Sequence, residues 1–223
     1  MNRWINKDTE IYCSFAKTAG NTGCQMMNTA FYYYGLNKIY KSFSVDSIES
    51  AVNAVRTLNV KGFAVTMPYK IDILKYVEIE DVVDGYSSNI LEDIGAINTV
   101  LNKDGKLYGY NTDYLAAKQK LKEIKPAEIY ILGNGGYAKA VKYVCSGRGQ
   151  LYIPNHTITR ENWSEISELH NTCIYNCTPV KNIKYHSSNM FIDCIVTTET
   201  GRELANMQAS HQFKLYTGLE FPL

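Results

Sequence analysis

Three short polar segments contain side chains that could move a proton during a reaction. They include Lys70, Asn98 and Asp113, and each segment follows a run of residues typical of a strand. Because open α/β sheets place their ligand crevice at the carboxyl ends of the strands, we expect the three segments to meet there. The carboxylate would orient the amine, which would exchange a proton with a substrate hydroxyl. The alternative is a solvated Lys70 and an Asp113 that only caps a helix.

A glycine-rich turn in the second half of the chain has the spacing of a dinucleotide-binding fingerprint. Gly133, Gly135, Gly136 and Ala138 follow a predicted strand at 128–132 and open a predicted helix. The first glycine of the fingerprint permits the tight turn, the second lets the backbone approach a pyrophosphate, and the small third residue, Ala138, lets the helix pack on the strand. The pattern therefore predicts a dinucleotide cofactor.

The segment about 20 residues further on favours NADP over NAD. A carboxylate there would hold the ribose 2′-hydroxyl of NAD, but the segment contains no acid before Glu161. His156 and Arg160 are basic instead, which favours a 2′-phosphate. The alternative is that both are ordinary surface residues.

Alternating strands and helices must position these residues. In the first half, the predicted strands are 10–15, 39–43 and 62–66, with helices at 24–34 and from Ser47 onward. In the second half, the predicted strands are 128–132, 150–153, 173–175 and 190–195, with helices at 161–169 and 201–215, and a helix at 114–124 joins the halves. This alternation indicates an α/β fold with mostly parallel sheets.

Composition excludes several classes of partner and site. The 223 residues include 23 Lys and Arg against 22 Asp and Glu, so no basic surface is expected for nucleic acid. We find no apolar run of membrane-spanning length and no signal peptide, and we expect a cytoplasmic protein, monomeric or homodimeric, with no membrane partner. The six cysteines are expected to be free thiols. Cys173 and Cys177 are four residues apart, but no second pair of ligands at zinc spacing accompanies them, so no metal is predicted.

Seven segments resemble motifs of the shikimate dehydrogenase family, in the same order along the chain. The segment at 62–70 (GFAVTMPYK) resembles the family's G-x-N-V-T-x-P-x-K. The other matching segments are 94–100 (IGAINTV), 109–113 (GYNTD), 133–138 (GNGGYA), 155–157 (NHT), 176–179 (NCTP) and the C-terminal segment from Met207 to Pro222.

The resemblance implies a two-domain enzyme of aromatic amino acid biosynthesis that transfers hydride between NADP and a cyclic secondary alcohol, shikimate or a related compound. It implies an N-terminal α/β substrate domain at 1–111, to which the C-terminal helix at 203–223 returns. The Rossmann-type dinucleotide-binding domain would occupy 112–202.

The resemblance also assigns roles to individual residues. Lys70 matches the catalytic lysine and Asp113 its partner, and Thr66, Asn98 and Gln208 match positions that hydrogen-bond substrate hydroxyls. The residues that match cofactor-binding positions are Gly133, Gly135, Gly136, Ala138, Asn155, His156, Thr157, Arg160 and Thr178.

Several positions depart from the family's pattern on the substrate side. Asn21 and Gly23 stand where two serines hold the substrate carboxylate, Ala64 replaces an asparagine, and Val196 replaces a substrate-facing tyrosine. Each hydrogen bond lost to a charged group costs roughly 1.5 to 3 kcal/mol, so the affinity for shikimate itself is expected to fall by orders of magnitude. The short stretch between Pro179 and Gln208 suggests a trimmed cofactor domain.

Three functions therefore remain open. The first is a shikimate dehydrogenase-like oxidoreductase with an altered carboxylate pocket. The second is a nucleotide-binding homologue that has lost turnover, and the third is a reductase of a related substrate without a carboxylate.

Overall fold

The computed structural model describes residues 5–78, 82–83, 86–148 and 151–222, and its contacts divide the chain into two units. Unit 1 comprises Met1–Thr112 and Ala209–Leu223, and unit 2 comprises Asp113–Gln208. The first boundary lies one residue after the expected domain limit, and the second lies six residues after it. The second boundary falls within the C-terminal helix α6 (Glu199–Thr217).

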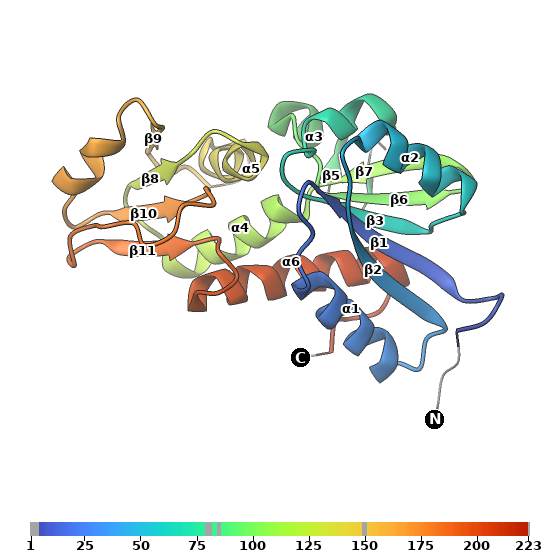
Figure 1. Cartoon of the computed structure of the whole chain (residues 1–223). Helices are drawn as coiled ribbons and strands as arrows, with labels where there is room; N and C mark the ends of the chain where they lie inside the picture. The colour runs from blue at the N-terminus through green and yellow to red at the C-terminus, as the bar shows by residue number, and fades with distance from the viewer. Residues whose placement is uncertain (1–4, 79–81, 84–85, 149–150, 223) are drawn as a thin grey trace. The chain divides into compact units, whose positions relative to one another are not determined.

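Unit 1 is built on a mixed sheet with the strand order β2-β1-β3-β6-β7 (Figure 1). Its strands are β1 (Glu10–Ala16), β2 (Lys38–Ser44), β3 (Gly62–Val65), β6 (Thr99–Lys103) and β7 (Lys106–Tyr110). The first three are parallel, as predicted. Strands β6 and β7 form an antiparallel hairpin, which the alternation of strands and helices did not predict. The hairpin turns at Asp104 (φ 54°) and Gly105 (φ 88°), and an Asp-Gly pair is a strong signal for such a turn.

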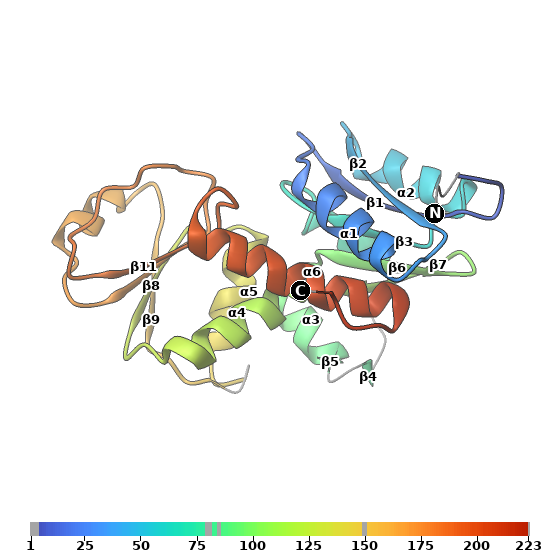
Figure 2. The same cartoon turned by 90° about the horizontal axis from the view of Figure 1, so that it is seen from below.

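Helices cover both faces of this sheet. Helix α2 (Ile48–Thr57) begins after Ser47, whose Oγ accepts a hydrogen bond from the Ser50 backbone N–H (3.3 Å). Its apolar stripe packs on one face of the sheet, with Val52 and Val55 fully buried. Helix α1 (Thr22–Tyr33) and the end of α6 cover the other face (Figure 2).

The returning end of α6 completes the second core of unit 1. Phe213 is fully buried and lies 5.8 Å from the ring of Phe31 on α1, and Tyr216 lies 4.9 Å from the ring of Tyr12 on β1. The Tyr12 hydroxyl also donates to the Tyr216 carbonyl oxygen (3.1 Å). Residues from the two ends of the chain therefore form one core, as the family resemblance implied.

The remaining elements of unit 1 come after β3 and before β6 along the chain. They are a 3-10 helix η1 (Asp72–Tyr76), a two-stranded ladder of β4 (Val82–Val83) and β5 (Tyr86–Ser87), and helix α3 (Ser88–Ile94).

Unit 2 contains a four-stranded parallel sheet with the order β11-β10-β8-β9 (Figure 1). Its elements are α4 (Thr112–Ile124), β8 (Ile129–Leu132), α5 (Gly136–Cys145), β9 (Asn155–Ile158), the 3-10 helix η2 (Trp163–Glu168), β10 (Cys173–Asn176), β11 (Met190–Asp193) and the first part of α6. The chain goes from β8 outward to β9 and then crosses to β10 on the other side of β8. This reversal creates the switch point at which doubly wound sheets bind nucleotides.

The predicted strand at 150–153 was wrong. Gln150 lies outside the described residues, and the following apolar run forms only an isolated bridge between Ser146 and Tyr152, whose side chain is 86% exposed. The polar segment Asn155–Ile158 forms strand β9 instead. It is one of the two edge strands of the sheet, and an edge strand does not need the apolar residues that a central strand buries. The predicted helix at 161–169 is only the short 3-10 helix η2.

Among the residues that the structure describes, we find no helix with the length and apolar character needed to cross a membrane.

Candidate functional site

In unit 1, the segment that carries Thr66 and Lys70 is held by backbone hydrogen bonds on both sides. The Thr66 N–H donates to the Phe15 carbonyl at the end of β1 (3.0 Å), and the Ile97 N–H donates to the Lys70 carbonyl (2.8 Å). Thr66 is exposed and Lys70 is half-buried. The structure therefore brings the Lys70 segment beside the segment before β6, as the strand-end argument predicted.

A buried hydrogen-bond network joins that segment to the end of β7. Asn98 is 3% exposed, and its Oδ1 accepts from the Thr112 backbone N–H (2.7 Å) while its Nδ2 donates to Thr112 Oγ1 (2.9 Å). Thr99 Oγ1 donates to Asn98 Oδ1 (3.0 Å) and accepts from Gln212 Nε2 on α6 (3.0 Å). Much of the bonding capacity of the Asn98 amide is thus used in holding the site together.

The predicted Gln208 is half-buried on α6, one helical turn before Gln212. Gln212 and Thr112 were missed as members of this network. Their partners are distant in sequence, at Thr99 and Asn98, so no local pattern pointed to them.

The end of β7 leads directly into three buried polar residues, Asn111, Thr112 and Asp113. Asn111 Nδ2 donates to the Ala96 carbonyl (2.8 Å), which ties this turn to the segment before β6. Asp113, 1% exposed, stands in the first turn of α4 and is the first residue of unit 2. Because α4 begins at Thr112, Asp113 lies inside its first turn rather than at the N-cap position, and a carboxylate there suits the positive end of the helix dipole.

The loop before α1 places Asn21 and Gly23 at the start of that helix. Asn21 is exposed, occupies the N-cap position and makes no capping hydrogen bond through its side chain. Gly23 packs close to the Tyr40 ring, which an added Cβ would meet at 3.4 Å. Lys17 in the same loop pairs with the exposed Asp46 (2.6 Å).

In unit 2, the glycine turn has the backbone geometry that a nucleotide-binding loop needs. Gly133 has φ +100°, which L side chains rarely adopt, and an added Cβ would lie 2.8 Å from the Thr178 side chain. Gly135 caps α5 in an extended conformation, and the first turn of that helix contains no acid. Ala138 is fully buried under the turn. The amino end of α5 thus presents N–H groups and a positive dipole suited to a phosphate.

A cavity of about 640 Å³ lies against this turn. Its lining residues come from the ends of β8, β9 and β10: Gly133, Asn134, Thr159, Arg160, Glu161, Trp163, Thr178, Pro179 and Val180. The cavity therefore occupies the switch point of the sheet. Of the predicted cofactor residues, Gly133, Arg160 and Thr178 line it.

His156 does not line this cavity, and neither do its neighbours Asn155 and Thr157. All three lie on β9 rather than after it, because the strand begins and ends later than predicted. The His156 ring stacks on Tyr130 (4.7 Å between centroids) and its Nε2 lies 2.7 Å from Glu128 Oε1. After β9, Thr159, Arg160 and Glu161 line the cavity, so a cation and an acid both border it.

A pair of buried tyrosines lies beneath the site in unit 2. The Tyr137 and Tyr175 hydroxyls are 2.8 Å apart, and burial raises the pKa of both well above its usual value. The nearby carboxylate of Asp113 and the thiols of Cys177 and Cys194 raise the pKa of each phenol further. Both phenols are therefore neutral and serve as hydrogen-bonding groups near neutral pH.

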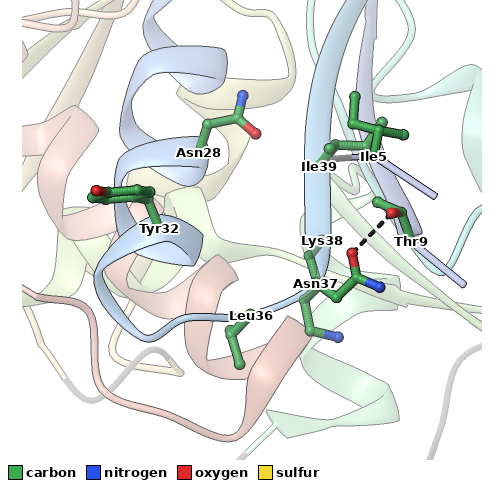
Figure 3. Close-up of a pocket in the computed structure, with 8 residues that line it drawn as sticks. All are labelled: Ile5, Thr9, Asn28, Tyr32, Leu36, Asn37, Lys38 and Ile39. Atoms are coloured by element: carbon green, nitrogen blue, oxygen red, sulfur yellow. Dashed lines mark hydrogen bonds between the residues drawn. The ribbon is translucent and has the colours of Figure 1, made fainter. Parts of the chain in front are cut away.

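A smaller cavity of about 150 Å³ lies in unit 1 between α1 and the start of β2 (Figure 3). Figure 3 shows Asn28 and Tyr32 on the helix and, across from them, Thr9, whose hydroxyl donates to Asn37 Oδ1 (2.8 Å). This cavity is at the amino ends of β1 and β2, opposite the edge where α/β sheets bind ligands. Within the described part of the chain, no cluster of three or more His, Cys, Asp or Glu side chains could hold a metal ion.

The fold and the glycine turn define a two-unit α/β protein with a Rossmann-type nucleotide-binding unit. Residues 22–100 match the shikimate dehydrogenase substrate binding domain. A shikimate dehydrogenase (NADP(+)) of Pyrococcus furiosus is 35% identical over 161 residues, which cover 70% of this chain and 57% of the relative. A shikimate dehydrogenase-like protein of Haemophilus influenzae is 36% identical over 141 residues, which cover 61% and 49%.

A solved structure of a shikimate 5-dehydrogenase-like protein has the same fold throughout. It superposes with a TM-score of 0.76 at 25% identity and covers 99% of this chain and 95% of that one. The chain spans about half the length of the curated relatives that it matches. The chain belongs to the shikimate dehydrogenase family.

Proposed function

We propose that this protein is an NADP-dependent oxidoreductase that transfers hydride between the cofactor and a cyclic secondary alcohol or ketone, shikimate or a close relative. The observation that carries the proposal is the cavity at the switch point of unit 2, bounded by the positive-φ Gly133 and by Thr178. A nucleotide pyrophosphate fits the amino end of α5, and Arg160 would contact the 2′-phosphate that distinguishes NADP from NAD. The name of the Pyrococcus furiosus relative supports the same cofactor.

In this proposal, Lys70 and Asp113 act on the reacting oxygen. Bound NADP+ would supply the hydride acceptor when the alcohol is oxidised. The Lys70 amine takes the hydroxyl proton, and in the reverse direction the ammonium returns it to the carbonyl oxygen. Asp113 orients the amine towards that oxygen.

Thr66 and Gln208 would bind the other hydroxyls of the substrate, and the segment of Asn21 and Gly23 would lie near its acidic end. The Asn98 amide already forms hydrogen bonds with Thr112. In this proposal it shapes the pocket, and it binds substrate only through the hydrogen-bonding positions that Thr112 does not use. Without the two serines, a substrate with a weaker need for carboxylate contacts would suit the pocket better than shikimate.

The test is a turnover assay on the purified protein with NADP+ and a panel of shikimate, quinate and cyclic polyols without a carboxylate. We expect NADPH formation with at least one of them and its loss in Lys70→Ala. If no compound reduces the cofactor at millimolar concentration although NADP+ binds in a titration, the oxidoreductase proposal fails. The protein would then be a nucleotide-binding homologue without turnover.

A further inference from the structure

Two cysteines follow neighbouring strands at the carboxyl edge of the unit 2 sheet. Cys177 comes directly after β10 and Cys194 directly after β11. The two strands are parallel, and their last paired residues are Asn176 and Asp193. The Cys194 N–H donates to the Asn176 carbonyl (3.1 Å), so the ladder continues into the next position. Cys177 and Cys194 are therefore lateral neighbours.

The separation expected from this register suits a disulfide. Neighbouring strands lie about 4.8 Å apart, and bridged cysteines have Cα atoms about 4.4 to 6.8 Å apart. Paired residues also share a face of the sheet: Asn176 Nδ2 donates to Asp193 Oδ1 (3.0 Å). One position further, Cys177 and Cys194 share the opposite face.

The surroundings of the two thiols agree with that placement. Both act on the same pair of phenols, Tyr137 and Tyr175, whose pKa each thiol helps to raise. Both cysteines are half-buried, whereas Cys145 and Cys173 in the same unit are at most 2% exposed. An oxidant in solution can therefore reach the first pair more easily than the second.

We propose that Cys177 and Cys194 form a reversible disulfide with a small disulfide oxidant such as oxidised glutathione. One cysteine, as its thiolate, attacks the oxidant, forms a mixed disulfide and releases one glutathione thiolate. The second cysteine loses its proton and attacks the protein sulfur of the mixed disulfide, which forms the intramolecular bond and releases the second glutathione. Two cysteines are oxidised, one glutathione disulfide is reduced to two thiols, and the two cysteine protons end on the leaving glutathiones or in water.

This disulfide would change the nucleotide cavity, an effect that rests on the proposed function. Cys177 immediately precedes Thr178, which lines the cavity, and its N–H donates to the Leu132 carbonyl beside Gly133 (3.0 Å). Cys194 Sγ lies 3.7 Å from the Thr178 carbonyl oxygen as a hydrogen-bond donor. Oxidation removes that S–H and with it the hydrogen bond to the Thr178 carbonyl, so we expect the Thr178 segment to shift. We expect about a tenfold rise in the Kd for NADP+.

The cross-link is tested by mass spectrometry on the full chain. After treatment with oxidised glutathione, the protein should lose two hydrogens, and a non-reducing digest should join the peptides of Cys177 and Cys194. Cys177→Ser and Cys194→Ser should each abolish this product, whereas Cys24→Ser, a half-buried cysteine of unit 1, should not. Separate glutathione adducts on Cys177 and Cys194, or a bond between other cysteines, would overturn the proposal.

The effect on the cavity is tested by calorimetric titration with NADP+ before and after oxidation, with the double variant Cys177→Ser/Cys194→Ser as the control. Equal affinities of the reduced and oxidised protein would overturn the coupling. If the reduced protein does not bind NADP+, the proposed function fails, while the mass spectra still decide whether the disulfide forms.

Discussion

At the scale of single residues, the chemistry of this protein depends on how burial modifies a few polar side chains. Lys70 is half-buried, while Asp113 has almost no exposure. Replacing a buried carboxylate leaves its hydrogen-bond partners unsatisfied, so a substitution at Asp113 should have a measurable effect. On α6, burial lowers the pKa of His211.

Asp113→Asn keeps the shape of the side chain and removes its charge. If Asp113 orients the Lys70 amine, kcat should fall about 10²- to 10⁴-fold while the protein remains folded. The matched control is Asp104→Asn in the exposed β6–β7 turn, where asparagine also tolerates positive φ. Steady-state kinetics measures kcat, and an unchanged kcat in Asp113→Asn would show that Asp113 only supports the first turn of α4.

His211 should make stability depend on pH. Burial lowers the pKa of its imidazole, the nearby Lys214 lowers it further, and Glu220 partly opposes the effect. The unfolded chain therefore takes up the proton first, and the free energy of unfolding should fall as the pH drops below about 6.5. Urea unfolding at pH 8 and at pH 5.5 measures this, and His211→Gln should reduce the difference. If the free energy of unfolding of His211→Gln changes between pH 8 and pH 5.5 by as much as that of the unmodified protein, other groups cause the pH dependence.

At the scale of elements, the nucleotide cavity is formed where three strands end. The turn after β8, the residues after β9 and the segment after β10 meet because parallel strands end at the same edge. Among the residues that line the cavity, Gly133 has a positive φ (+100°). That position is therefore the most sensitive point of the cavity.

Gly133→Ala should impair cofactor binding through the backbone. Alanine at φ +100° is strained, and its Cβ would lie 2.8 Å from the Thr178 side chain. We expect at least about a tenfold rise in the Kd for NADP+, since a strained residue costs roughly 1 to 3 kcal/mol. Gly105→Ala is the control, because Gly105 also has positive φ (88°) but an added Cβ there meets nothing within 4 Å. Calorimetry should show unchanged binding for the control, and unchanged binding for Gly133→Ala would count against a nucleotide at this turn.

At the scale of the whole molecule, the chain leaves unit 1 at Thr112 and returns to it at Ala209. The fold of unit 1 therefore includes the C-terminal residues from Ala209 onward. The rings of Phe213 and Tyr216 close the core formed by Tyr12 and Phe31. This arrangement makes unit 1 more sensitive than unit 2 to changes at the C-terminus.

A chain that ends at Gln208 should lose the cooperative unfolding of unit 1. Loss of two buried aromatic side chains alone costs roughly 3 to 5 kcal/mol each, which is comparable to the stability of a domain. A chain that ends at Gly218 keeps both rings and is the control. Thermal unfolding by circular dichroism, together with limited proteolysis, should show unit 1 cleaved first in the shorter chain. A single native-like transition in that chain would show that unit 1 folds without the helix.

Features that depend on neighbouring residues could be predicted from the sequence. The glycine turn at Gly133, the capped helix α2 and the three parallel strands of unit 1 follow from local spacing, and all three are confirmed. The β6–β7 hairpin was also encoded locally, by Asp104 and Gly105, although this signal was overlooked. Strand β9 was misplaced because its edge position, which only the complete sheet defines, removes the usual apolar pattern.

The sequence by itself determined the α/β fold, the dinucleotide turn and the family, because each rests on short motifs whose residues are close along the chain. Only the tertiary structure decided which distant side chains meet. Gln212 joins Thr99, and Arg160 with Glu161, rather than His156, faces the nucleotide cavity. Cys177 lies beside Cys194, not beside the Cys173 to which its spacing first drew attention. The physical reason is that strand register and sheet order determine which residues are lateral neighbours, and the spacing of residues along one strand predicts neither.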